Sequence, residues 1–337
     1  MGGAVESRSG RRYRRARRLR SDRRGVVAVI GTLLALLVFF ALFGLFLTQY
    51  VPIWMGENEA TFTSAAGASF AQLKADIDTQ YVLGVPPTLG TPFTISSGNI
   101  PLIAQPTQGS LVFVPQTCPR GFYALGVTGA TSANYGQPVN SSYCVFENQS
   151  LSIGPGGSGP YYLTVPTGIL SMELPNRYYP SQFYQLEADG VVQVQSGGLQ
   201  QMAYSPPFNV TSLAGNTTVS SSFLQLYGNA TTITGQGSED VYSHLRFTQH
   251  LASVGSPTLR YTFEIGTQYP CAWSKFLWHQ LNVSGVIPSG QYSFSPYTGS
   301  CNNPTGVTTD LTLALTAVNY ASIYYAGVIL SIGIGGA

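Results

Sequence analysis

The most constraining feature of this sequence is a long apolar run near its start, Val26–Tyr50, with Gly31 and Gly44 as its breaks. Its first 22 residues, Val26–Leu47, contain no charged side chain. About 20 apolar residues are enough for a helix to cross the hydrocarbon core of a bilayer. The run therefore predicts a transmembrane helix over residues 26–50, with the lipid bilayer as its partner.

The segments before and after this run differ sharply in charge. Residues 1–25 hold ten Arg and two acidic residues, a net charge of +8, whereas residues 26–337 hold six basic and twelve acidic residues, a net charge of −6. Basic residues gather on the cytoplasmic side of membrane helices. We therefore expect a basic cytoplasmic leader over residues 1–25 and an extracellular C-terminal domain, in a single-pass protein of the cell membrane. The exported part has no basic patch, so a nucleic-acid partner is not expected.

The leader meets the apolar run at Arg24-Gly25-Val26-Val27. An ordinary secretory signal has a shorter apolar core and a small-residue cleavage site behind it, which Thr48-Gln49-Tyr50 does not provide. A basic leader that ends in Arg-Gly directly before a membrane helix resembles the class III signal of archaeal type IV pilins and pilin-like proteins. The resemblance implies that a prepilin peptidase cuts after Gly25 and leaves Val26 as the mature N-terminus. An uncleaved signal anchor is the alternative.

A second helix is expected after the membrane run. Pro52 lacks an N–H group and should kink or end the first helix. Apolar residues then recur every three or four positions, at Phe62, Ala66, Phe70, Leu73 and Ile77. This spacing predicts an amphipathic helix from about Glu57 to Tyr81, within a stalk of residues 51–84 that ends near Gly84. Glu57 and Glu59 would lie at its start, where the helix dipole favours acidic side chains.

Residues 85–337 consist of short alternating runs separated by turn residues, which is typical of antiparallel β structure. The expected strands include Ser110–Val114, Ile169–Leu174, Gln182–Glu187, Val241–Phe247, Thr258–Ile265, Asn282–Val286, Tyr292–Ser295 and two strands within residues 311–337. Asp189-Gly190 predicts a tight hairpin turn. A short helix over Ala272–Leu281 should bury Trp273 and Phe276.

The fold class expected from these elements is mainly β with a long N-terminal helix. A pilin-like membrane helix is followed by an amphipathic helix that packs on an antiparallel β-sandwich-type ectodomain. Residues 85–337 form this β-rich domain, with two subdomains and a boundary near residues 165–175 as the alternative to one domain. The resemblance to archaeal pilin-like envelope proteins extends over roughly residues 23–85 and 165–285.

All four cysteines lie in the exported part, which suits an oxidising compartment. Two local pairs are expected to form disulfides, Cys118 with Cys144 and Cys271 with Cys301, although two other connectivities exist. A metal site is less favoured because no Cys-x-x-Cys motif occurs.

Six Asn-x-Ser/Thr sequons make glycosylation an expectation for an exported chain that is poor in charge. They begin at Asn140, Asn148, Asn209, Asn216, Asn229 and Asn282.

No catalytic motif is recognisable. The three histidines, His244, His250 and His279, occur without a metal-binding or nucleophile motif around them. The acidic residues Glu239-Asp240, Asp76 and Asp78 are expected to be solvated, and Asp189 is assigned to its turn. We therefore expect no enzymatic activity, no cofactor and no metal.

Three classes of function follow. The first is a membrane-anchored structural or adhesive protein, a type IV pilin-like subunit or minor pilin whose N-terminal helix contacts other pilin-like subunits. The second is an uncleaved, signal-anchored surface receptor or adhesin that does not polymerise. An anchored hydrolase is the third and has the least support. A mature chain of 312 residues, if cleaved after Gly25, suggests a minor or specialised subunit.

Overall fold

The structure is a computed structural model, and it describes residues 10–84, 87–98, 104–115, 122–128, 161–213, 216–283, 292–295 and 309–333. The chain divides into two compact units, Met1–Gly56 and Glu57–Ala337. Helix α1 (Gly10–Leu83) contributes to both of them.

The first unit is the N-terminal part of α1. Among the described residues, one helix is long and apolar enough to cross a membrane, and its most apolar 18-residue stretch has a mean hydropathy of 2.9 with none of it buried. Apolar side chains are exposed on every side of this stretch, including Leu34, Leu37 and Phe40. A helix that is apolar all round requires an apolar surrounding. The prediction of such an N-terminal helix is confirmed.

The expectation that Pro52 could end this helix is wrong, because α1 continues through Pro52 to Leu83. A proline inside a helix removes one backbone hydrogen bond and costs about 3 kcal/mol, but the turns on either side keep their own bonds. Glu57 and Glu59 therefore lie inside a helix, so the prediction that they complement a helix N-terminus is also wrong. The predicted C-terminal boundary is confirmed, since Gly84 follows the helix with φ +61°.

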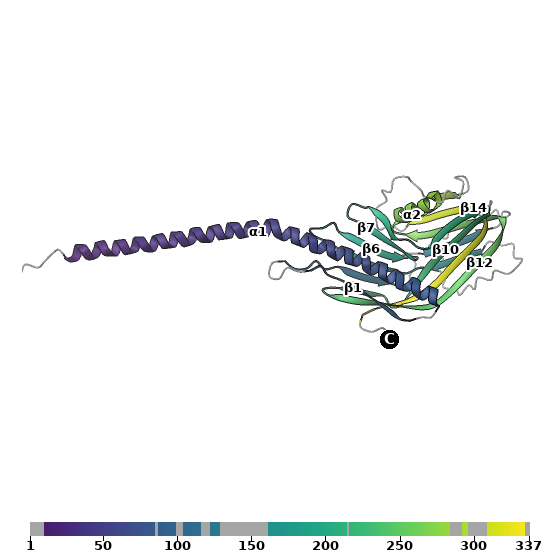
Figure 1. Ribbon diagram of the computed structural model, residues 1–337, viewed down its shortest axis with the longest axis horizontal. Coiled ribbons are helices and arrows are strands. Elements are labelled where there is room, and N and C mark those ends of the chain that lie inside the picture. Colours follow the sequence, from purple (N-terminus) through teal and green to yellow (C-terminus); the bar gives the residue numbers. More distant parts are fainter. Residues whose placement is uncertain are drawn as a thin grey trace, which may run out of the picture. The chain divides into compact units, whose positions relative to one another are not determined.

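The second unit contains two sheets. The eight-stranded sheet consists of β1 (Leu89–Thr94), β3 (Phe122–Thr128), β4 (Tyr161–Pro166), β9 (Phe208–Leu213), β10 (Asn216–Tyr227), β12 (Ser238–Thr267), β13 (Tyr292–Ser295) and β14 (Thr309–Ile332). The six-stranded sheet consists of β2 (Ser110–Val114), β5 (Ile169–Leu174), β6 (Gln182–Glu187), β7 (Gly190–Gln195), β8 (Gln200–Tyr204) and β11 (Thr231–Thr234). The mainly β fold class is thereby confirmed (Figure 1).

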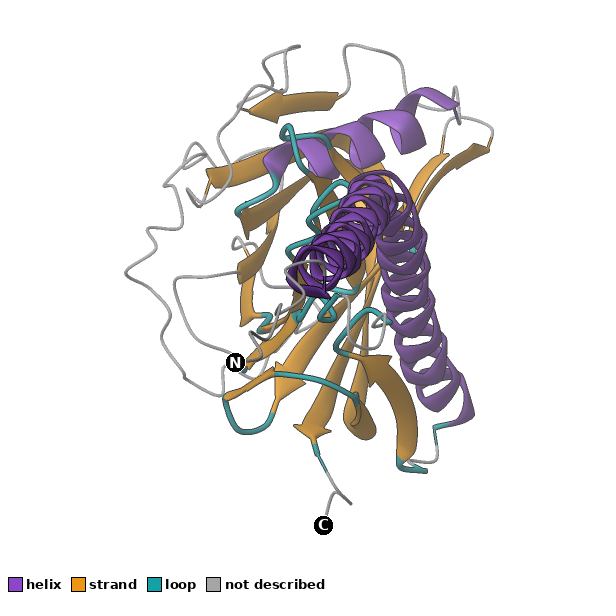
Figure 2. Cartoon of the chain, turned by 90° about the vertical axis from the view of Figure 1, so that its left-hand side faces the viewer, coloured by secondary structure: helices purple, strands orange, loops and turns teal. Residues whose placement is uncertain are grey.

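The strand order places the last described strand in the interior of its sheet. The order of the larger sheet is β4-β3-β12-β14-β10-β9, and that of the smaller one is β11-β2-β5-β6-β7-β8. Among the described strands, β10 and β14 run parallel to each other, whereas β14 and β12 pair antiparallel, as do the neighbours within the smaller sheet. Figure 2 shows the strands and the helical elements from a second direction.

Several strand predictions agree with the structure to the residue, namely those for β2, β5, β6 and β13. Others need correction. The separate strands expected over residues 241–247 and 258–265 are parts of the single strand β12, which keeps its pairing with β14 across register shifts. The two strands expected within residues 311–337 are likewise one strand, β14. Asn282 lies in α2 (Pro270–Val283), because helical periodicity continues to the end of that segment.

The hairpin predicted around Asp189 is confirmed as the β6–β7 hairpin, but its two-residue turn is one position earlier than the predicted Asp189-Gly190. Glu187 pairs with Gly190, and the two turn residues, Ala188 and Asp189, have φ of 46° and 71°. Both central residues of a type I′ turn need positive φ, and Asp tolerates this better than most residues. The positive φ values thus fall on Ala188 and Asp189 rather than on Asp189 and Gly190, and this places the Asp189 side chain at the end of the hairpin.

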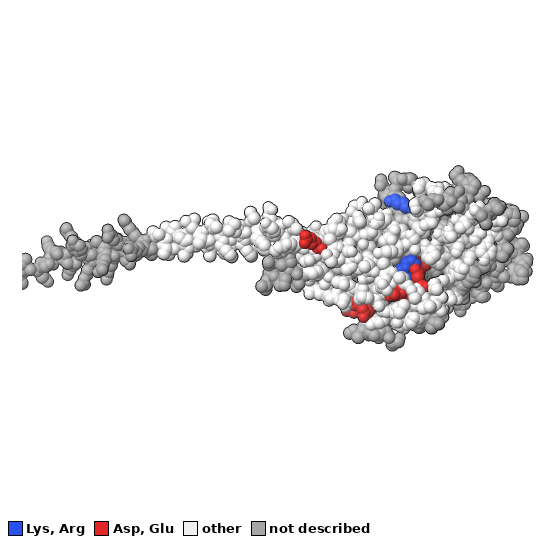
Figure 3. Space-filling view, viewed as in Figure 1, with Lys and Arg blue, Asp and Glu red and all other residues white. Residues whose placement is uncertain are grey.

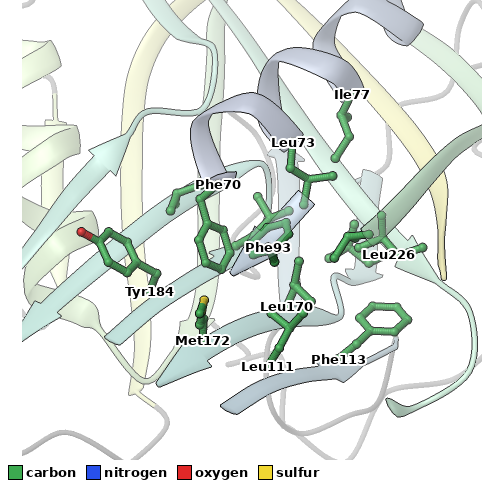
Figure 4. Packing of buried hydrophobic residues seen from close by; sticks show 14 of the residues in the cluster. Phe70, Leu73, Ile77, Phe93, Leu111, Phe113, Leu170, Met172, Tyr184 and Leu226 are labelled. Carbon is green, nitrogen blue, oxygen red and sulfur yellow. The ribbon is translucent and has the colours of Figure 1, made fainter. Parts of the chain in front are cut away.

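The C-terminal part of α1 packs into a core made by both sheets. Its predicted stripe of Phe62, Ala66, Phe70, Leu73 and Ile77 is buried, and it contacts residues of β2, β5, β6 and β7 on one sheet and β1, β10, β12 and β14 on the other. Figure 4 shows Phe70, Leu73 and Ile77 pointing from the helix into this cluster. The Phe70 ring lies edge-on to Phe93 at 5.1 Å and stacks with Tyr184 at 5.8 Å.

A second core cluster surrounds α2, which packs on β8, β9 and β14. Trp273, Phe276 and Leu277 are buried in it, as predicted. Cys271 is buried in the first turn of α2. Its expected partner Cys301 and the expected pair Cys118 and Cys144 lie outside the described residues, so both disulfides stay predictions.

Candidate functional site

The candidate site is built around Lys74, which lies on the sheet-facing side of α1 and is only 7% exposed. Its ammonium nitrogen Nζ donates to Asp189 Oδ1 at 2.9 Å and to both oxygens of Asp78 at 3.1 Å. Asp78 is one helical turn further along α1, so that the helix itself sets this contact. Asp189 reaches Lys74 from the β6–β7 turn. The ion pair therefore joins α1 to the smaller sheet.

A strand of the larger sheet completes the group. Ser222 on β10 donates its hydroxyl hydrogen to Asp189 Oδ2 at 2.7 Å. Asp189 is buried, whereas the Asp78 side chain is 48% exposed. Each oxygen of Asp189 thus accepts one hydrogen bond, and each comes from a different structural element.

These contacts shift the proton affinities of the group. Burial lowers the pKa of Lys74, but Asp189 and Asp78 together outweigh burial and raise it above the usual value. Burial and the charge of Asp189 raise the pKa of Asp78, and Lys74 opposes this shift. With all three groups ionised, the cluster carries a net charge of −1.

A pocket of about 220 Å³ lies beside this cluster, between α1 and strand β10. Its lining comprises Ile77, Asp78 and Tyr81 of α1, Asp189 of the turn, Pro207, Ser220–Leu224 of β10, and Tyr324 and Ala326 of β14. In Figure 3 charged side chains are few on the described surface, and red and blue atoms adjoin a hollow beside α1. Two charged side chains, Asp78 and Asp189, line the pocket, and both are carboxylates. Lys74, their ion-pair partner, is not part of the lining.

Two tyrosines form an aromatic corner of the pocket. The rings of Tyr81 and Tyr324 are 6.0 Å apart with an interplanar angle of 88°. Burial, with smaller contributions from Tyr324 and Asp189, raises the pKa of Tyr81 to about 12. This phenol therefore stays neutral at physiological pH. Ser221, which also belongs to the lining, has a buried hydroxyl with no hydrogen-bond partner.

Comparison with protein-family models, with curated proteins and with solved structures finds no match to this chain. The chemistry of the pocket must therefore be argued from its own residues.

The pocket lining does not contain the Ser-His or Cys-His arrangement of a nucleophilic hydrolase. Ser222 is paired with a carboxylate, but no His or Cys is among the lining residues. Within the described ranges, no group of three His, Cys, Asp or Glu residues could hold a metal ion. Apolar walls, two carboxylates and several hydroxyls are instead the composition of a small binding pocket.

The structure brings together only two of the acidic residues singled out from the sequence, Asp78 and Asp189. Asp76 forms hydrogen bonds with Thr91 and Gln72, away from the pocket lining. Asp240 is exposed near the start of β12.

The two histidines whose side chains are described, His244 and His279, are not among the residues that line the pocket. His279 is exposed on α2, and His244 Nδ1 lies 3.5 Å from the Thr88 hydroxyl. The side chain of His250 is outside the described set.

Four of the six sequon asparagines are described, and all four are exposed: Asn209, Asn216, Asn229 and Asn282. Asn282 Oδ1 accepts a hydrogen bond from the Tyr292 hydroxyl. Asn140 and Asn148 lie outside the described residues.

Sequence reasoning missed Lys74, although a signal was present. Lys74 and Lys275 are the only lysines in the chain, and Lys74 follows Leu73 within the apolar stripe of the helix. A lysine at the edge of such a stripe needs a carboxylate partner if it is buried. Asp78 at i+4 was visible as that partner, but Asp189, 115 residues away, was not.

Proposed function

We propose that the protein is a membrane-anchored extracellular surface protein with the organisation of a type IV pilin-like subunit or minor pilin. The observation that carries the proposal is the character of α1. Its apolar stretch is exposed all round, and further along the same helix a stripe is buried in the core of a β domain. Such a helix serves as membrane anchor and as structural part of the exported domain.

The orientation follows from charge. The ten Arg of residues 1–25 keep the leader in the cytoplasm, and the acidic remainder is exported. In this arrangement the exposed sequons Asn209, Asn216, Asn229 and Asn282 face the compartment in which sugar is attached. Glycans there would add solubility to a surface that has few charges.

Processing at Gly25-Val26 separates a pilin-like protein from an uncleaved anchor. Mass spectrometry of the native protein isolated from membranes gives its N-terminal residue. A chain that starts at Val26 supports the pilin-like proposal, and a Gly25→Leu variant should then keep its leader. A Gly31→Ala variant, changed inside the apolar run, should be processed normally. A wild-type chain that retains the leader would overturn the pilin-like proposal.

The pocket beside Asp78 favours the second candidate, a surface receptor that remains an anchored monomer. Recognition of a small ligand needs a pocket of this kind, whereas polymerisation through the N-terminal helix does not. Cross-linking of the protein in native membranes distinguishes these candidates, because a receptor of this type gives no ladder of oligomers.

A further inference from the structure

We propose that the pocket between α1 and β10 binds a small alkylammonium group, with Asp78 as the counter-charge and the rings of Tyr81 and Tyr324 as the aromatic wall. The site goes beyond anchoring and display, since neither needs a ligand. Three properties of the pocket favour this ligand: its charge, the shape of its aromatic corner and its size.

The charge of the pocket favours a cation. Asp78 and Asp189 are the charged residues of the lining, while the single neutralising ammonium, that of Lys74, lies outside it. Both oxygens of Asp189 are already engaged, by Lys74 and by Ser222. Both oxygens of Asp78 accept from the same donor, Lys74 Nζ, at 3.1 Å, and the side chain is 48% exposed, so the open side of its carboxylate remains accessible to an incoming cation.

The aromatic corner favours an ammonium that carries alkyl groups. The two rings meet edge to face, 6.0 Å apart at 88°, and both residues line the pocket, so they offer it aromatic surface of the kind that attracts alkylated ammonium ions through the negative face of a ring. Ile77, Leu224 and Ala326 supply apolar contacts for the alkyl groups. A strongly hydrated inorganic cation would gain little from such walls, whereas an organic cation gains from all of them.

The volume limits the ligand. The space of about 220 Å³ is smaller than the ~300–1,000 Å³ of pockets that bind drug-sized molecules. It fits one short alkylammonium, either a free quaternary ammonium compound or the end of a lysine side chain from another chain. Both share the chemistry of the proposal, and the experiment distinguishes them.

The test is a calorimetric titration of the full chain in a nonionic detergent. Choline represents the quaternary ammonium, butylammonium represents a lysine side chain, and the neutral analogue of choline, with carbon in place of nitrogen, is the reference. We expect millimolar or tighter binding of at least one cation and much weaker binding of the neutral analogue. Tighter binding of choline indicates a small quaternary ligand, and tighter binding of butylammonium indicates a protein side chain.

Single substitutions test whether the cation binds in this pocket. Asp78→Asn keeps the side-chain shape and should weaken binding of the preferred cation about tenfold, because the negative charge that would pair with the bound ammonium is lost. Asp240→Asn makes the same change in net charge on an exposed residue outside the lining and should leave the affinity unchanged. Tyr81→Phe keeps the ring and should bind nearly as wild type, whereas Tyr81→Leu should bind several-fold more weakly.

Circular dichroism shows whether each variant is folded. The proposal is overturned if folded wild-type protein binds neither cation, if the neutral analogue binds as tightly as the preferred cation, or if Asp78→Asn binds that cation as tightly as wild type. These outcomes do not depend on how the N-terminus is processed, so the proposed function can fail separately.

Discussion

Two buried glutamates in the β domain show how the surroundings of one residue type determine its role. Glu59 of α1 accepts hydrogen bonds from three successive backbone N–H groups, those of Arg177, Tyr178 and Tyr179, at 2.7–3.1 Å, and from the Thr107 hydroxyl. Burial raises its pKa, but the hydrogen bonds outweigh burial and leave the pKa below the usual value. Successive N–H groups of this kind form an anion-binding concavity, and here a side chain of the same chain fills it.

In Glu187 the effect of burial on the pKa outweighs that of the hydrogen bonds. Its carboxylate accepts from Gln185 Nε2, Thr267 Oγ1 and Trp273 Nε1, each at 2.6 Å. Complete burial raises its pKa, and these three hydrogen bonds only partly offset that effect. The hydrogen bonds of Glu187 therefore connect β6, β12 and α2, but keeping a buried carboxylate ionised costs free energy of folding.

Replacing Glu59 by Gln should destabilise the β domain by about 2–3 kcal/mol at neutral pH. The amide has only one acceptor oxygen, and its NH₂ group would face backbone N–H groups that are themselves donors. The exposed residue Glu57 is the matched control, and Glu57→Gln should change stability by less than about 0.5 kcal/mol. Chemical unfolding followed by tryptophan fluorescence measures both. Equal effects of the two substitutions would show that the Glu59 contacts contribute nothing.

The contribution of Glu59 should also depend on pH. Because its pKa is lowered by folding, its stabilisation is complete above the unfolded-state value of about 4.3 and is lost as the pH falls through the folded-state value. Wild type should therefore lose more stability on acidification below about pH 4.3 than Glu59→Gln does. Parallel unfolding curves of the two proteins at all pH values would contradict this prediction.

Glu187→Gln should be tolerated far better than Glu59→Gln. The substitution removes a buried charge, one oxygen can still accept from Thr267 and Trp273, and the Gln185 amide can rotate to accept from the new NH₂ group. We expect a change of stability within about 1 kcal/mol at neutral pH. A thermal unfolding curve checks this, and a loss as large as that of Glu59→Gln would mean that the charge of Glu187 stabilises the fold.

At the scale of elements, α1 is held in the β domain by its apolar stripe. Phe70 is completely buried and contacts Phe93 and Tyr184, so Phe70→Ala should cost about 3–5 kcal/mol. Gln72 is exposed on the same helix and bonds only to Asp76, so Gln72→Ala should have little effect. Denaturant unfolding of both variants measures the difference. Similar stabilities would show that the stripe does not hold the helix.

The same element shows what the sequence can and cannot predict. The 3.6-residue period of the stripe and the alternation of strands such as β5 and β6 are local patterns, and both predictions are confirmed. The prediction that Pro52 could end the helix is wrong, because tertiary and neighbouring helical contacts can override the cost of one missing hydrogen bond. The parallel pairing of β10 with β14 has no local signal, since their partners are about 100 residues apart.

The candidate site is the least predictable part. The placement of Asp189 in a turn is confirmed, yet the contact of that turn with Lys74 depends on how α1 crosses the sheet. The prediction for Glu59 is wrong because α1 continues through Pro52, so that no helix N-terminus lies near Glu59. Its true partners, the backbone N–H groups of residues 177–179, cannot be identified from side-chain chemistry at all.

At the scale of the whole molecule, the two lysines can be used to test on which side of the membrane the β domain lies. Lys275 is exposed on α2, whereas Lys74 is buried and has a raised pKa, which keeps its amine protonated and unreactive. A membrane-impermeant amine reagent applied to intact cells should therefore modify Lys275 and leave Lys74 intact. Peptide mass spectrometry reads both sites. Modification of Lys275 only after the cells are permeabilised would place the β domain in the cytoplasm.

The position of β14 has a consequence for biogenesis. This strand lies between β12 and β10, so the larger sheet is complete only when residues 309–332 are in place. If the β domain is exported as proposed, these residues must first cross the membrane. Pairings between segments so distant in sequence form slowly. On that proposal, the chain stays incompletely folded while it is being translocated. A product that ends before Thr309 would expose the unpaired edges of β12 and β10, which makes it a substrate for proteases.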